Sequence, residues 1–127
     1  MTTHMTTKGR KLMDEIFNML VSRAYASSGV TDFTLEDVKF VFEYYFTAYE
    51  LTFGENHPHI RLEQIERIIQ AMPVIIGNCN SEQYIDAEGY TALIDKHFET
   101  QYRNCDYNVN HFFSGDIRAM RYFETLY

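Results

Sequence analysis

The sequence predicts an all-α fold, a compact bundle of about five helices in which the helix over residues 35–53 is central. Apolar residues recur at intervals of three and four along most of the chain, which is the spacing of one helix face. Three segments also carry the chemistry of helix starts. Residues 73–77 are the one stretch with strand character, and one short strand cannot make a stable sheet.

The chain has the size of one domain. It contains 127 residues, of which 46% are hydrophobic and 16% aromatic, so burial can offset the entropy lost on folding. No Ser-, Gly- or Pro-rich linker interrupts it. The sequence therefore predicts a disordered N-terminal tail at residues 1–7 and a single helical domain over residues 8–127.

Three helix starts share one pattern, at residues 33–38, 60–65 and 85–90. Each has an apolar residue, a cap position, an early acid and a second apolar residue five positions after the first. This is the arrangement of a hydrophobic staple, with acids at the positive end of the helix dipole. Thr34 and Asp86 are favourable caps, whereas Arg61 is a poor one. The third helix therefore has an alternative start near Asn56, with Pro58 in its first turn.

The predicted helices cover about residues 8–27, 35–53, 61–72, 87–103 and 115–126. Gly29, Gly54 and Pro73 end the first three. Four helices have an apolar stripe expected to face the core. In chain order the stripes are Leu12, Ile16, Met19, Leu20 and Arg23; Leu62, Ile65, Ile68, Ile69 and Met72; Tyr90, Leu93, Ile94, His97 and Phe98; and Ile117, Met120, Phe123 and Leu126.

The 35–53 helix is apolar around most of its circumference. Seven aromatic rings lie between Phe40 and Phe53, and the polar side chains gather within an arc of about 80°. Most of the rings are expected to lie in the core. Three residues flank the polar arc and are expected to form an exposed patch with its acids. The predicted partner-binding residues are Glu36, Phe40, Glu43, Tyr44, Glu50 and Leu51.

The distribution of charge favours a basic partner. The net charge is −7, but residues 32–99 alone carry −9 while residues 1–31 carry +2. An acidic body repels phosphate, so direct binding of nucleic acid is not expected. A protein with a basic surface is the expected partner, and a homodimer through the aromatic edge is the alternative.

No motif in the sequence specifies catalysis or a cofactor. The chain is therefore predicted not to be an enzyme and to need no cofactor. Cys79 and Cys105 are expected to be reduced thiols. His57 and His59, two residues apart, keep a metal-binding or catalytic domain as an alternative, and Cys79, Cys105, His97 and His111 are its further candidate ligands. The spacing does not match a zinc motif, so no metal site is predicted.

The expected cellular compartment is inferred from the lack of signal-peptide and transmembrane segments in the sequence. No apolar run has the length of a signal peptide or a transmembrane helix. The protein is therefore expected to be cytoplasmic, with no membrane partner.

Together these features predict a non-enzymatic acidic helical module that binds a basic, nucleic-acid-binding surface of a partner protein. Its small size and acidity resemble those of inhibitors and accessory factors encoded by phages and mobile elements, although no motif carries the resemblance. The alternative is a replication or transcription accessory protein that contacts nucleic acid through basic residues of the first and last helices. Those residues are Lys8, Arg10, Lys11, Arg118 and Arg121.

Overall fold

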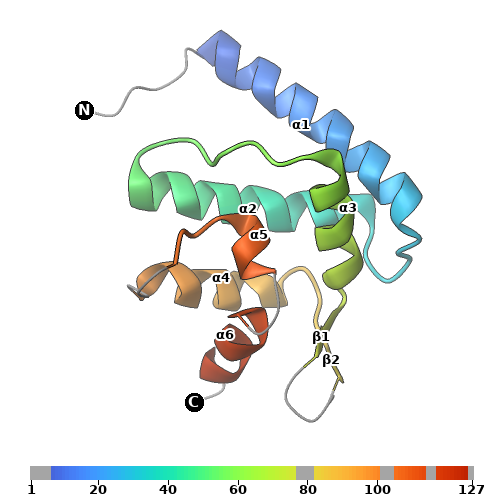
Figure 1. The fold of residues 1–127 in the computed structure, drawn as a ribbon, viewed down its shortest axis with the longest axis vertical. Helices are drawn as coiled ribbons and strands as arrows, with labels where there is room; N and C mark the ends of the chain where they lie inside the picture. The colour runs from blue at the N-terminus through green and yellow to red at the C-terminus, as the bar shows by residue number, and fades with distance from the viewer. Residues whose placement is uncertain (1–6, 77–81, 101–104, 114–116, 126–127) are drawn as a thin grey trace.

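The computed structural model describes residues 7–76, 82–100, 105–113 and 117–125, with side chains from Glu15 onward apart from Ile76. Within these residues the chain forms six helices and one two-stranded hairpin (Figure 1). In chain order they are α1 (Thr7–Ser28), α2 (Leu35–Phe53), α3 (Leu62–Ala71), β1 (Val74–Ile76), β2 (Glu82–Tyr84), α4 (Gly89–Glu99), α5 (Val109–Phe112) and α6 (Ile117–Thr125). The predicted all-α bundle is confirmed.

The helices are stacked around α2. Helix α1 contacts α2 and α3, α2 also contacts α4, and α4 contacts α6. Figure 1 shows the segment after α2 running back along that helix on the side of α1, while α4 and α5 lie on its other side. The central position predicted for residues 35–53 is therefore observed.

Local chemistry sets both ends of α2. The Thr34 hydroxyl accepts a hydrogen bond from the Asp37 N–H, and the Asp37 carboxylate accepts one from the Thr34 N–H, both at 3.1 Å. This reciprocal pair is a capping box. Gly54 adopts the left-handed conformation with φ of 71° and donates its N–H to the Glu50 carbonyl at 2.7 Å. The helix therefore occupies the residues predicted for it.

The alternative start of α3 near Asn56 is wrong. The helix begins at Leu62, after Arg61, whose backbone N–H donates to the Gln64 side chain at 2.8 Å. A side chain three residues into the helix thus compensates for the poor cap. Helix α4 begins at Gly89, whose N–H donates to Asp86, and ends at Glu99. Residues 101–103 of the longer prediction lie outside the described part of the chain.

Two elements were not predicted. The strand-like segment does form β1, but it pairs antiparallel with β2 in the register Val74 with Tyr84 and Ile76 with Glu82. Helix α5 lies in a segment expected to make turns. The predicted tail is partly corrected as well, because Thr7 belongs to α1, while residues 1–6 lie outside the described part.

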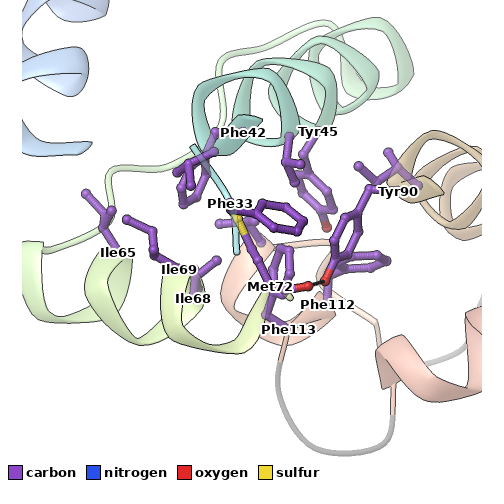
Figure 2. Close-up of a cluster of buried hydrophobic side chains, with 14 of the residues drawn as sticks. Phe33, Phe42, Tyr45, Ile65, Ile68, Ile69, Met72, Tyr90, Phe112 and Phe113 are labelled. Carbon is purple, nitrogen blue, oxygen red and sulfur yellow. Dashed lines mark hydrogen bonds between the residues drawn. The ribbon is translucent and has the colours of Figure 1, made fainter. Parts of the chain in front are cut away.

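The core is rich in aromatic rings. Figure 2 shows Phe42 and Tyr45 of α2, Tyr90 of α4 and Phe112 of α5 gathered with the apolar face of α3. The Tyr90 hydroxyl donates to the Met72 carbonyl at 2.6 Å, and the buried Tyr45 hydroxyl donates to the Tyr107 carbonyl at 2.7 Å. The hydroxyls of Tyr45 and Tyr90 therefore both have a partner, as buried phenols require. The predicted stripes of α3 and α4 face this core.

The stripe predicted for the last helix is wrong, and so is most of the stripe predicted for the first helix, of which Leu20 alone among the described side chains packs against the core. Among the described side chains of α1 the buried ones are Val21 and Ala24, whereas Met19 is 72% exposed and Ile16 is 43% exposed. In α6 the buried residues are Arg118, Ala119 and Arg121. The spacing of apolar residues predicted that the opposite face of α6 is buried, because such a prediction assumes that arginine faces water.

Candidate protein-binding site

An exposed ridge runs along α2 on the side away from the core. Every third or fourth residue is exposed, while the residues between them are buried or half-buried. The ridge consists of Glu36, Phe40, Glu43, Thr47 and Leu51. It mixes acids with large apolar side chains, as the sequence predicts.

A groove lies on one side of this ridge, between α2 and α4, and we call it the α2–α4 groove. It has a volume of about 400 Å³. Leu51 is 81% exposed and Phe40 is 42% exposed. The residues lining it are Phe40, Glu43, Tyr44, Thr47, Ala48, Leu51 and Asp95. The groove is an apolar trough with a carboxylate on each helix.

Tyr44 links the two walls of the α2–α4 groove. Its hydroxyl donates to Asp95 at 2.7 Å, and its ring lies 6.0 Å from that of Phe40. The bond to Asp95, helped by burial and by the negative charge of that carboxylate, raises the pKa of Tyr44. Tyr44 is therefore a fixed part of the wall, since the hydrogen bond orients its ring.

Four of the six predicted partner-binding residues converge on this groove: Phe40, Glu43, Tyr44 and Leu51. Glu50 lines a groove on the other side of α2, and Glu36 is exposed at the start of the ridge. Sequence reasoning missed Asp95. Nothing local to Asp95 places it beside Tyr44, because the two are 51 residues apart and meet only through packing of α4 on α2.

The second groove, which we call the α1–α2 groove, is formed by α1, α2 and the segment after α2. It has a volume of about 540 Å³. Its apolar lining includes Phe17, Leu20, Phe46 and Ile60, and its charged lining includes Lys39, Glu43 and Glu50. Glu43 and Thr47 line both grooves, so the ridge separates them.

His57 anchors the segment that borders the α1–α2 groove. Its Nδ1 lies 2.7 Å from the Pro58 carbonyl, which can only accept, so Nδ1 carries the proton. Its Nε2 then accepts a hydrogen bond from the Val109 N–H at 2.9 Å. Burial lowers the pKa of His57, although the Pro58 carbonyl and Asp106 oppose this effect. A neutral imidazole with both nitrogens engaged is a structural group here and not a free metal ligand.

Two residues of the alternative nucleic-acid surface are buried. Arg121 is 1% exposed and Arg118 is 7% exposed, and both donate to groups inside the protein. They cannot reach a phosphate backbone in this conformation, so this part of the alternative is corrected. Lys8, Arg10 and Lys11 belong to the first turns of α1, and their side chains lie outside the described part.

The fold brings only some of the candidate metal ligands and thiols together. Among the described residues there is no group of three or more His, Cys, Asp or Glu side chains able to hold a metal ion. His97 Nε2 lies 3.9 Å from the Cys105 sulfur, and its Nδ1 accepts from the Arg121 Nε at 3.0 Å. His59 is exposed, and Cys79 lies outside the described residues.

Comparisons of the chain with protein-family models, with curated proteins and with solved structures gave no match. A search of the described helices for one both long and apolar enough to span a bilayer found none. The site's own geometry is therefore the basis for a functional proposal.

Proposed function

We propose that the protein is a non-enzymatic cytoplasmic interaction module that binds a basic surface of a partner protein through the α2–α4 groove. The observation that carries the proposal is the pairing, in one groove, of the exposed apolar side chains of Phe40 and Leu51 with the carboxylates of Glu43 and Asp95. Protein interfaces combine an apolar anchor at the centre with a polar or charged rim. A partner segment with an apolar side chain flanked by Lys or Arg fits this groove.

The charge of the whole chain supports the same type of partner. Residues 32–99 include all of α2 and α4 and carry a net charge of −9. Complementary charge of this kind speeds encounter with a basic surface and makes the affinity depend on salt. We therefore expect binding to weaken as the salt concentration rises.

The proposal has a finer form that names the partner's class. A basic surface on another protein is commonly one that binds nucleic acid, because phosphate contacts use Lys and Arg. An acidic ridge seated on that surface competes with the nucleic acid. The protein would then act as an inhibitor or regulator, in the manner of the factors made by phages and mobile elements.

The proposal is tested by affinity capture from cells that express the protein, comparing groove variants with matched controls. Leu51→Ser and Asp95→Lys change the α2–α4 groove. Met120→Ser changes an exposed apolar residue on α6, and Glu88→Lys makes a charge reversal at the start of α4, both outside either groove. We expect the partner to be captured by wild type and both controls and lost with both groove variants.

A purified partner then allows the electrostatic and competitive parts to be tested. We expect its affinity to fall by about tenfold or more between about 0.05 M and about 0.5 M salt, because screening shortens the reach of surface charges. Added nucleic acid should displace the protein. An affinity that is equal in all variants, or unchanged by salt, would contradict the proposal.

A further inference from the structure

The α1–α2 groove lies on the side of the ridge opposite the α2–α4 groove. Its apolar lining consists of Ile16, Phe17, Leu20, Phe46, Pro58 and Ile60, of which Ile16 and Pro58 are exposed and the others are half-buried or buried. Glu43 and Glu50 of α2 lie along one wall. The groove is thus an apolar trough with carboxylates, bordered by residues of α1 and α2.

The N-terminal half of α1 leaves the body of the protein beside this groove. The C-terminal half is fixed by the buried Val21 and Ala24 and by the Ser27 hydroxyl, which donates to Glu66 at 2.9 Å. Figure 1 shows the helix diverging from α2 toward its N-terminal end. Ile16 and Met19 are exposed at the point of divergence. A helix half of this length is marginal without packing, so a contact that covers it would stabilise it.

The same chain carries the complementary charge. Lys8, Arg10 and Lys11 all belong to the first turns of α1, and together with Asp14 and Glu15 they give residues 7–17 a net charge of +1. The wall of the α1–α2 groove has Glu43 and Glu50 against the single Lys39. A basic helix end that leads to the exposed Ile16 and Met19, and an acidic groove with an apolar lining, are therefore present on every copy.

From this complementarity we infer that the protein forms a symmetric dimer, in which the N-terminal half of α1 of each copy lies in the α1–α2 groove of the other. Two-fold symmetry uses the same pair of surfaces twice, so both basic helix ends meet an acidic wall. Ile16 and Met19 are buried at the centre of the contact. The dimer does not depend on the proposed function, because the α1–α2 groove shares only Glu43 and Thr47 with the α2–α4 groove and contains neither Leu51 nor Asp95.

Sedimentation analysis of the full chain tests the dimer. We expect wild type to sediment at twice the monomer mass of 15.0 kDa at about 0.05 M salt, and to shift toward monomer at about 0.5 M. Met19→Glu should give a folded monomer, because it places a carboxylate at the apolar centre. Met120→Glu, the same change at an exposed position of α6, should remain a dimer.

A charge exchange makes the test specific to the two surfaces. The double variant Lys8→Glu and Lys11→Glu, and separately Glu50→Lys, should each be monomeric, because each homodimer then places like charges together. A mixture of the two should form a heterodimer, since both of its contacts again join opposite charges. Far-ultraviolet circular dichroism confirms that each variant is folded.

Three results would overturn the inference: a wild-type monomer at all concentrations, a dimer that Met19→Glu leaves intact, or a mixture that fails to associate. A dimer broken by Leu51→Ser, and not by Met19→Glu, would assign the contact to the aromatic edge instead. Partner capture is tested with Leu51→Ser and Asp95→Lys, neither of which changes a residue of the α1–α2 groove, so the dimer and the proposed function fail separately.

Discussion

Arg118 and Arg121 of α6 carry guanidinium groups into the core, and each is held by different acceptors. Arg118 donates to the Ala71 and Val74 carbonyls and to the Tyr90 hydroxyl, so it joins the end of α3, the hairpin and α4. Its Nε is buried without a hydrogen-bond partner among the described residues. Arg121 donates to His97 and pairs with Glu124 at 3.0 Å. Buried cations of this kind are costly unless such acceptors are present.

Replacing Arg118 should destabilise the fold strongly. Arg118→Ala removes three hydrogen bonds and leaves buried acceptors unpaired, so we expect the free energy of unfolding to fall by about 2 to 4 kcal/mol. Urea unfolding measures the change. The control is Arg67→Ala, at an exposed position of α3, where about 0.5 kcal/mol or less is expected. Equal effects of the two substitutions would mean that the Arg118 contacts do not stabilise the protein.

His97 should make stability depend on pH. Burial, together with the charges of Arg121 and His111, lowers its pKa to about 3, while Asp106 opposes the shift. The unfolded chain, with a pKa near 6.5, therefore binds the proton more readily than the folded protein. The contribution of neutral His97 to the free energy of unfolding is complete above pH 6.5. It is lost as pH falls from 6.5 toward about 3, at up to about 1.4 kcal/mol per pH unit.

This dependence can be isolated by comparing variants. Unfolding of wild type and of His97→Asn is measured between pH 8 and pH 4, and we expect the variant to be less stable but to lose less stability with acid. His59→Asn changes an exposed histidine and should follow the wild-type curve. Parallel curves for wild type and His97→Asn would contradict the assignment.

At the scale of elements, the helices differ in where their stability comes from. Helix α2 has its own signals at both ends, a capping box at Thr34 and a left-handed Gly54. Helix α5 has four residues and depends on distant groups, because its first N–H donates to His57, 52 positions earlier. A helix this short is not stable alone. This is why the sequence predicts α2 to the residue and misses α5.

The cap of α2 can be tested within the same helix. Thr34→Ala removes the hydroxyl that accepts the Asp37 N–H, so we expect a loss of about 1 kcal/mol in the free energy of unfolding. Thr47→Ala makes the same change at an exposed position in the middle of α2, where alanine is the better helix former. This control should be neutral or slightly stabilising. A loss as large at Thr47 would show that the cap is not the cause.

At the scale of the molecule, sequence reasoning gave five helices, a central α2 and most of the ridge, because these follow from local periodicity and helix signals. Contacts between distant segments could not be predicted. Asp95 joins the α2–α4 groove only through packing, and β2 pairs with β1 although its sequence, Glu-Gln-Tyr, shows no alternation of apolar and polar residues. In α6 the buried Arg118 and Arg121 reverse the rule that charge faces water, so its stripe was assigned to the wrong side. In α1 the error has the opposite form, because Arg23 was included in the stripe and is exposed.

Three core contacts also affect when the core can close during synthesis on the ribosome. The hydrogen-bond partners of Tyr45, His57 and His97 all come later in the chain. They are the carbonyl of Tyr107, the amide of Val109 and the guanidinium of Arg121, respectively. Synthesis proceeds from the N-terminus, so α1 to α4 emerge before these partners, and a core that closed without them would bury the three groups unpaired. We therefore expect the core to close only after residues 107–121 have emerged, which leaves the aromatic side chains within reach of chaperones until then.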